Sequence, residues 1–318
     1  MRLLVNLEQQ YEVWIDAEQT LFSLPYGMKW KRISGGEYLY ELADRAGNGS
    51  SLGPRSQATE ARYADYQVEK SMAIERRDQS AARLAETGRL YRALRLPMLA
   101  SEAAAILREA DRRSLLGSHL LVVGTNAMPA YAIEAAGRIA DAPDETQDFD
   151  MAWTASRQNT EPPVLWPLLK AVDATYTINT EHPNQARNAS AYEVELLVAP
   201  SRDAGFGRRD RPRPVPLEEQ EWLLNGRPVS HVVVARDAST ARIVAPDPRW
   251  FAMQKLWLSE QDKRNPLKRP KDARQALSLL RAVAETMPQY PLDAEFEAQL
   301  PPPLMQCYAR WQAAQASP

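Results

Sequence analysis

The sequence is nearly devoid of cysteine and poor in histidine, which limits the chemistry it can perform. Its 318 residues include one cysteine, Cys307, and three scattered histidines, His119, His182 and His231. A single cysteine excludes an intramolecular disulfide, and so few ligands argue against a Cys/His zinc site. This cysteine usage fits a reducing, cytoplasmic setting.

Long apolar runs and an excess of one charge are also missing. No stretch approaches the roughly 20 apolar residues of a membrane span. The start, MRLLVNLEQQYEVW, turns polar after Val5, so we expect neither a signal peptide nor membrane contact. Lys and Arg total 39 and Asp and Glu total 41, for a net charge of -2. This balance provides no global basic field that would indicate nucleic-acid binding.

The order of apolar and turn residues predicts an α/β (α+β) chain in three parts. Residues 1–97 are expected to form an N-terminal hairpin and a helical arm. Residues 98–216 alternate short apolar runs with helical segments, which indicates a core with a short mixed sheet. Residues 217–318 are expected to form a second hairpin and a helical region.

Within the first part, Gly35 and Gly36 separate two apolar runs and predict a hairpin turn. The Gly/Ser-rich segment 47–56 predicts a loop. Residues 57–96 predict one or two long charged helices, with Gly88 as the weak point. Their basic side chains indicate either a solvated face or a face that contacts an acceptor substrate.

In the second part, the pattern predicts strands over 119–124, 148–153 and 191–200, and helices over 125–138 and 167–174. The segment DFDMAW places two carboxylates on its strand, Asp148 and Asp150. Residues i and i+2 of a strand point to the same side, and the flanking Phe149, Met151 and Trp153 indicate burial. Two like charges so placed repel, and a divalent cation relieves the repulsion.

Two further features complete a possible site. Gly124 ends the apolar run HLLVVG, where a glycine permits a tight turn and close approach of a ligand. The helix expected to start at Thr125 would offer free N–H groups to a phosphate. In AYEVELLVAP, alternation puts Glu193 and Glu195 on one face, and a carboxylate in an apolar run needs a partner. Each feature alone also fits ordinary packing or a solvent-facing carboxylate.

Taken in order, these features resemble the nucleotidyltransferase fold of the DNA polymerase β-like superfamily. More closely, the chain is similar to a bacterial family of nucleotidyltransferase-fold proteins. The likeness rests on six stretches: SLGPRSQATE (51–60), VVGTNAMPAY (122–131), TQDFD (146–150), YEVELL (192–197), PDPRWFAMQKLWLS (246–259) and KRPKDARQA (268–276).

The resemblance implies transfer of a nucleoside monophosphate from an NTP to a hydroxyl acceptor, with release of pyrophosphate. It implies that Asp148, Asp150 and Glu195 hold Mg²⁺ or Mn²⁺, and that Glu195 ligates the second metal or acts as base. Gly124 and Thr125 would bind the β- and γ-phosphates, and Lys255 would support them. Glu195 stands where aspartate is commoner in the superfamily.

Several alternatives stay open at the sequence level. The acceptor could be tRNA or a protein, as in a toxin with an antitoxin partner, or a small molecule such as an antibiotic. The chain could instead be a catalytically silent nucleotide-binding module. It could also be an RNA-binding protein that uses the arginines of loop 201–216, namely Arg202, Arg208, Arg209, Arg211 and Arg213.

Overall fold

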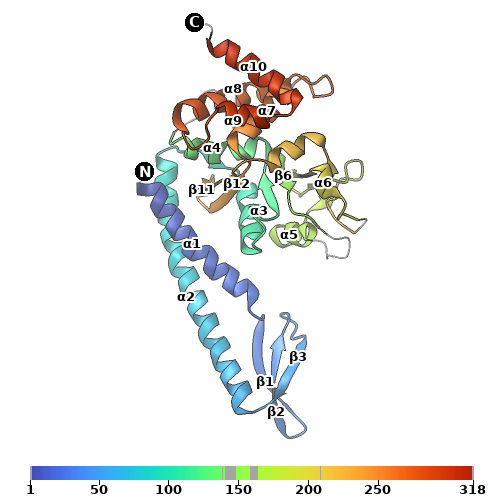
Figure 1. Ribbon diagram of the computed structural model, residues 1–318. Coiled ribbons are helices and arrows are strands. Elements are labelled where there is room, and N and C mark those ends of the chain that lie inside the picture. The colour runs from blue at the N-terminus through green and yellow to red at the C-terminus, as the bar shows by residue number, and fades with distance from the viewer. Residues whose placement is uncertain (1, 138, 140–147, 158–163, 208, 317–318) are drawn as a thin grey trace. The chain divides into compact units, whose positions relative to one another are not determined.

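The computed structural model describes residues 2–137, 139, 148–157, 164–207 and 209–316 (Figure 1). The chain divides into two compact units. The first comprises residues 2–87 together with 112–114, and the second comprises residues 88–111 and 115–318. The helices that the structure describes include none with the length and apolar composition of a membrane span.

The first unit is an antiparallel helical arm that carries a small sheet (Figure 1). Its elements are α1 (Arg2–Ser23), β1 (Gly27–Ile33), β2 (Gly36–Leu42), β3 (Gly49–Pro54) and most of α2 (Gln57–Ala93). Helices α1 and α2 pair through Gln10 with Thr87 and Asp16 with Arg76. The later residue of α1 contacts the earlier residue of α2, so the two helices run antiparallel.

In this unit the predicted hairpin is confirmed, the predicted loop is wrong, and the first helix was not predicted. The predicted hairpin at Gly35 is present as β1 and β2, which pair antiparallel. Segment 47–56, predicted to be a loop, forms the edge strand β3 against β2. The short runs of the first residues in fact form helix α1, whose buried Leu7, Tyr11 and Ile15 recur every fourth position and so line one face.

Helix α2 is one continuous helix rather than two. It passes through Gly88, where an added Cβ would lie 2.6 Å from the Ala238 carbonyl oxygen. Glycine is therefore required there by close packing against a neighbouring backbone, and it does not break the helix.

The second unit contains two sheets with helices around them. Its elements up to the second sheet's last strand are β4 (Met98–Leu99), α3 (Ser101–Arg112), β5 (Leu120–Val122), η1 (Gly124–Ala127), α4 (Met128–Glu134), β6 (Asp148–Trp153), α5 (Leu165–Val172), β7 (Thr177–Ile178), β8 (Gln185–Arg187), β9 (Glu193–Val198), α6 (Pro200–Asp203), β10 (Val215–Pro216), η2 (Glu218–Leu224), β11 (Val229–Ala235) and β12 (Thr240–Ala245). The helices that follow are α7 (Pro248–Ser259), α8 (Arg269–Thr286), α9 (Ala294–Gln299) and α10 (Pro302–Ala316).

The larger sheet is mixed, as expected for the predicted α/β class. Its order is β5-β6-β9-β8-β7, and β10 also pairs with β9. Strands β6 and β9 run parallel, whereas β5 pairs antiparallel with β6 and β8 antiparallel with β9. The second sheet has the order β12-β11-β4, and its β11–β12 pair is the predicted second hairpin.

Burial alternates along β9 as the sequence predicts. Val194, Leu196 and Val198 are fully buried, whereas Glu193 and Glu195 are half-buried. Each buried aliphatic side chain stabilises the fold by roughly 1.5–3 kcal/mol. This burial fixes the register of β9, because a slip by one residue would exchange its two faces.

The predicted helix 125–138 differs from the observed one. Residues Gly124–Ala127 form a 3₁₀ turn, and the α-helix α4 occupies Met128–Glu134. Arg138 and the predicted loop 141–147 lie outside the described residues.

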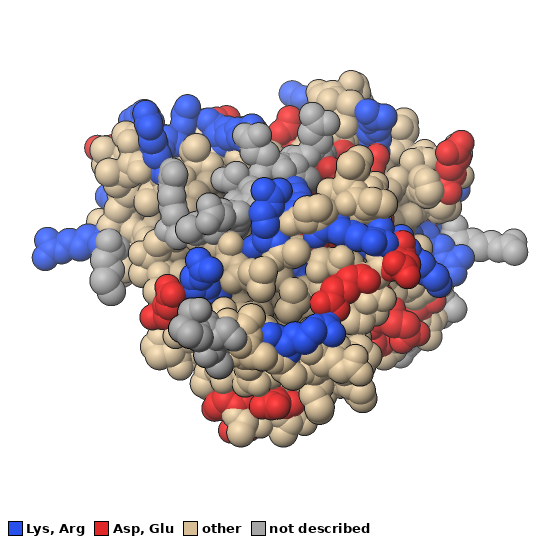
Figure 2. Space-filling view, turned by 90° about the horizontal axis from the view of Figure 1, so that it is seen from above, with Lys and Arg blue, Asp and Glu red and all other residues tan. Residues whose placement is uncertain are grey.

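The molecular face in Figure 2 shows basic and acidic side chains interspersed, consistent with the net charge of -2.

Cys307 lies on α10 and is 1% exposed. Burial raises the pKa of its thiol to about 11, and the nearby Glu260 carboxylate contributes to this rise. The thiol is therefore protonated at neutral pH.

Candidate active site

Two neighbouring parallel strands place the predicted acidic residues on one face of the larger sheet. On β6, Asp148 and Asp150 are half-buried and flank the fully buried Phe149. The register of β6 with β9 sets Asp148 opposite Glu193 and Asp150 opposite Glu195. Side chains opposite each other on neighbouring strands lie close together on one face. The expected proximity of Glu195 to the aspartate pair therefore follows from the observed strand order.

The turn after β5 packs closely against β6, the strand that carries Asp148 and Asp150. Gly124 adopts a φ of +67°, and a Cβ there would lie 2.1 Å from Asp150 Oδ2. The Val123 N–H donates to the Asp150 carbonyl oxygen at 3.0 Å, and Asn126 Nδ2 donates to the Asp148 carbonyl oxygen at 2.8 Å. The close approach that requires glycine is thus made by the carboxylate of Asp150.

The Asp150 carboxyl has an unusual protonation equilibrium. Its pKa is raised from 3.8 to about 6, mainly by loss of hydration, and repulsion from the Glu195 and Asp148 carboxylates contributes to this rise. Lys255 and Lys268 act in the opposite direction. Crowding of negative charge at a partly buried carboxyl is typical of sites that bind a cation or a proton.

This shift predicts a pH-dependent effect of Asp150→Asn on stability. A carboxyl with a raised pKa in the folded state binds more protons when folded, so its ionisation destabilises the fold as pH rises from about 4 to about 6. Without added metal, Asp150→Asn is expected to raise the Tm at about pH 7.5 and to have little effect at about pH 4. Differential scanning fluorimetry of both proteins measures this, and an equal change at the two pH values would contradict it.

Two of the acidic side chains are held by partners within the protein. Asn184 Nδ2 donates to Glu195 Oε1 at 2.7 Å, and Lys268 Nζ lies 3.3 Å from Asp148 Oδ2. Among the described residues, no group of three or more His, Cys, Asp or Glu side chains is placed so that it could hold a metal ion.

The chemistry of the donor set nevertheless suits a hard divalent cation. Carboxylate oxygens are the donors that Mg²⁺ prefers, and the repulsion at Asp150 is of the kind that a cation relieves. Lys268 contributes a positive charge at the same position. The donor chemistry therefore suits a divalent cation, while in the free protein Lys268 and Asn184 contact two of the three carboxylates.

Helices α7 and α8 supply the basic side of this region. Asp247 caps α7 by accepting from the Arg249 N–H at 2.9 Å, and Pro248 occupies the first turn, where proline is favoured. Two turns further along, Lys255 is 6% exposed. Its ammonium donates to Asp272 Oδ1 of α8 at 2.7 Å.

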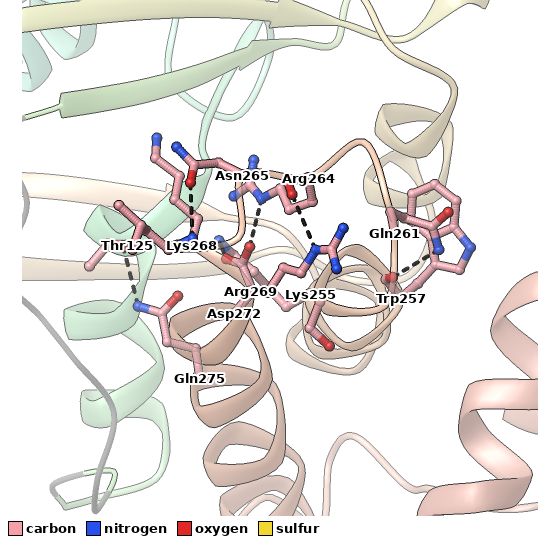
Figure 3. Close-up of polar contacts among 12 residues, drawn as sticks. Thr125, Lys255, Trp257, Gln261, Arg264, Asn265, Lys268, Arg269, Asp272 and Gln275 are labelled. Atoms are coloured by element: carbon pink, nitrogen blue, oxygen red, sulfur yellow. Dashed lines mark hydrogen bonds and ion pairs between the residues drawn. The ribbon is translucent and has the colours of Figure 1, made fainter.

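Asp272, the partner of Lys255, is also contacted by a residue of the loop between α7 and α8 (Figure 3). Arg264 Nε donates to the second carboxylate oxygen of Asp272 at 2.8 Å. Burial raises the pKa of the Asp272 carboxyl, but Lys255 and Arg264 lower it by more, so the net shift is downward. Lys255, predicted to support phosphates, thus has a buried protein partner.

Breaking this buried pair is expected to be costly. In Asp272→Asn, Lys255 would keep its charge without a counter-ion, and the free energy of unfolding should fall by about 3–5 kcal/mol. The matched control is Lys268→Gln, which removes an ion pair whose side chains are 51% and 38% exposed and should cost about 1 kcal/mol or less. Urea unfolding compares them, and similar losses would contradict the distinction.

Thr125 is 7% exposed. Gln275 of α8 contacts it, with Nε2 3.3 Å from Thr125 Oγ1 (Figure 3). Gln275 lies on the buried face of α8 with Asp272 and Leu279, at helical spacing. The turn predicted to bind phosphate is therefore packed against the C-terminal helices.

Three polar residues here were not predicted from the sequence: Asn184, Arg264 and Lys268. Lys268 lies in the stretch KRPKDARQA, whose K-D-x-x-Q-A element (271–276) predicts helix packing and capping or a phosphate contact, and Gln275 is the glutamine of that element. A signal was available, because Asp272 and Gln275 fall among the apolar positions that define the buried face of α8.

The arginine-rich loop 201–216 has structural anchors of its own. Arg157 forms a buried ion pair with Asp210 at 2.5 Å, and Arg202 donates to Ser156 Oγ at 2.9 Å. Arg208 lies outside the described residues.

A comparison with protein families finds one described as nucleotidyltransferase, which matches residues 101–300. This range includes β5, β6, β9, α7 and α8, which are the helices and strands that carry or adjoin the candidate site residues. No curated protein and no solved structure matches the chain.

Proposed function

The chain belongs to the nucleotidyltransferase family that it matches over residues 101–300, and from that premise we propose that it transfers a nucleoside monophosphate from an NTP to a hydroxyl acceptor. Pyrophosphate is the leaving group. The observation that carries the proposal is the placement of Asp150 between Asp148 on its own strand and Glu195 on the next, beside the Gly124 turn.

We assign Asp148, Asp150 and Glu195 as the ligands of Mg²⁺ or Mn²⁺. When bound there, a divalent cation would neutralise the triphosphate and lower the pKa of the attacking hydroxyl. The raised pKa of the Asp150 carboxyl supports this assignment, because its ionised form is the one that lacks compensation in the free protein. The assigned donors are also oxygen atoms only, as these metals prefer.

The chain's own residues then have distinct tasks. Lys268 lies next to Asp148 in the free protein. It would move to the triphosphate once the Asp148 carboxylate binds the metal. Lys255, fixed by Asp272, would hold a constant positive charge behind the site. Gly124 and Thr125 would bind the β- and γ-phosphates, and Glu195, oriented by Asn184, could accept the proton of the acceptor hydroxyl.

We further place the chain in the DNA polymerase β-like superfamily, with tRNA or a protein as acceptor. A toxin-like role with an antitoxin partner and a small-molecule acceptor are the other forms of this proposal. The order of elements supports the superfamily: a strand, a glycine turn, a helix, a strand with paired aspartates, and a later parallel strand with an acid.

A second candidate is a nucleotide-binding module that does not catalyse transfer. The contacts of Asp148 with Lys268 and of Glu195 with Asn184 favour it, since both carboxylates already have partners. Such a module would bind NTP with little dependence on the metal, because Lys255 and Lys268 supply positive charge.

Label transfer from each of the α-³²P-labelled NTPs tests the two candidates. The reactions contain Mg²⁺ or Mn²⁺ with total RNA, with small hydroxyl compounds, or with the protein alone. Transfer of label supports the enzyme and identifies its base and acceptor class. If no label moves but calorimetry detects NTP binding that Asp148→Ala leaves unchanged, the non-catalytic module is favoured instead.

A further inference from the structure

The small sheet of the first unit has two chemically different faces. Strand pairing sets Lys29 opposite Tyr40, Lys31 opposite Tyr38, and Trp30 opposite Leu39. Because side chains alternate along a strand, the two lysines and two tyrosines share one face and Trp30 and Leu39 share the other. The face formed by Lys29, Lys31, Tyr38 and Tyr40 is called the Tyr–Lys face below.

The opposite face is covered by helix α2. Leu39 is fully buried, and the Trp30 ring packs edge-on against Tyr63 of α2 with centroids 5.9 Å apart. The two acidic residues of β2 lie on this covered face. Glu37 pairs with Arg55 at 2.6 Å and Glu41 with Arg62 of α2 at 3.4 Å.

On strands β1 to β3, the Tyr–Lys face consequently carries basic side chains and no acidic ones. Strands β1, β2 and β3 are described in full, and no Asp or Glu stands on this face of them. Lys29 is exposed, and Lys31, Tyr38 and Tyr40 are half-exposed. Lys31 Nζ lies 4.2 Å from the centroid of the Tyr40 ring.

Such a surface is suited to one kind of ligand. Tyr38 and Tyr40 are two residues apart on one strand, so their Cα atoms are about 7 Å apart, and each ring can stack on a separate base. The lysines beside them can contact the phosphates between those bases. Aromatic rings on a sheet combined with adjacent basic side chains are typical of proteins that bind single strands.

We propose that the Tyr–Lys face binds single-stranded nucleic acid. An acidic peptide would satisfy the lysines but would leave the two rings without a stacking partner. The proposal concerns binding alone, and its test uses neither NTP nor divalent metal. It can therefore fail independently of the proposed transfer reaction.

The test uses the full chain with fluorescein-labelled oligouridine and oligothymidine about 12 nucleotides long, within the range of known single-strand sites. Fluorescence anisotropy gives the Kd as a function of salt. Lys31→Glu is expected to weaken binding about tenfold or more, because it reverses a charge at the phosphate path. Arg32→Glu is the matched control: it makes the same charge change one residue along, on the opposite face, and should have a much smaller effect.

Two variants separate stacking from charge. Tyr38→Leu with Tyr40→Leu keeps the charge and the apolar bulk, and should weaken binding at least fivefold per lost base contact. Lys29→Ala with Lys31→Ala should lower the slope of log K against log salt by about 1.4, since each phosphate contact contributes about 0.7. Circular dichroism confirms that each variant is folded, and if the tyrosine variant does not fold, the Lys31 and Arg32 pair decides.

The outcomes are distinct. Weaker binding in the lysine and tyrosine variants, with Arg32→Glu nearly unchanged, supports the proposal, and the two oligonucleotides tell RNA from DNA. Absence of binding by the folded wild type overturns it. So do equal effects of Lys31→Glu and Arg32→Glu, or competition by polyglutamate together with wild-type affinity in the tyrosine variant, which would indicate a surface that recognises charge alone.

Discussion

Replacing Asp148 and Asp150 together by asparagine should abolish nucleotidyl transfer while the fold stays intact. The amide keeps the size of each side chain but removes the negative charge that the proposed cation requires. Losing a single charge-stabilising group commonly costs an enzyme about 10²–10³-fold, so the double variant should lose at least that much. The fold should survive, because ionised Asp150 is itself destabilising without a cation.

The measurement is label transfer with the acceptor identified for the wild type, together with the Tm of both proteins. A suitable control is Glu193→Gln, which removes a carboxylate from the same sheet face, opposite Asp148, and should retain activity. If the folded double variant transferred label at the wild-type rate, the assignment of the site would be wrong.

Gly124→Ala should reduce transfer by about 10²-fold or more, because a displacement of about 1 Å at reacting groups can have that effect. The new Cβ would lie 2.1 Å from Asp150 Oδ2, so the carboxylate or the turn must move. The left-handed backbone adds a cost of about 1–2 kcal/mol in stability.

Gly117→Ala separates these two effects. Gly117 also has a left-handed backbone, with φ of +77°, but its added Cβ would meet the Val244 side chain at ordinary contact distances of 3.6 Å (Cγ1) and 3.9 Å (Cγ2). It should lose stability by a similar backbone cost of about 1–2 kcal/mol and keep its activity. Comparable activity in the two variants would show that the contact between Gly124 and Asp150 has no part in the reaction.

The acidic half of the candidate site could be predicted because its signals are local. The alternation in DFDMAW and YEVELL fixes which side chains share a face, and the apolar run before Gly124 marks the turn. Only the adjacency of β6 and β9 needed more than alternation, and the family resemblance supplied it. Their pairing sets Asp150 opposite Glu195.

The basic half could not be predicted in the same way, because it depends on tertiary packing. Lys268 and Asp148 are 120 residues apart in the chain, and Gln275 and Thr125 are 150 apart. Their meeting depends on how α7 and α8 pack, which no local pattern encodes. The sequence pattern at Lys255 fits either a solvated helix lysine or a support for phosphates, whereas its buried ammonium requires a fixed counter-charge, here Asp272.

Helix α1 and strand β3 were missed for different reasons. The spacing of Leu7, Tyr11 and Ile15 was helical, but polar residues between them hid the pattern. Strand β3 is rich in Gly, which is depleted in strands, and in Ser, which is common in turns. It forms because the edge of β2 offers backbone partners, with an irregularity between Leu39 and Tyr40 that accommodates Leu52.

The chemistry of Cys307 has a practical consequence. It is the sole cysteine of the chain, and a thiol that is 1% exposed with a pKa of about 11 reacts slowly with maleimides at neutral pH. A cysteine introduced at exposed Ser34, in the turn after β1, would therefore take up a fluorophore selectively, with the native residue left in place. One label would then report on the turn of the β1–β2 hairpin, whose strands carry the Tyr–Lys face.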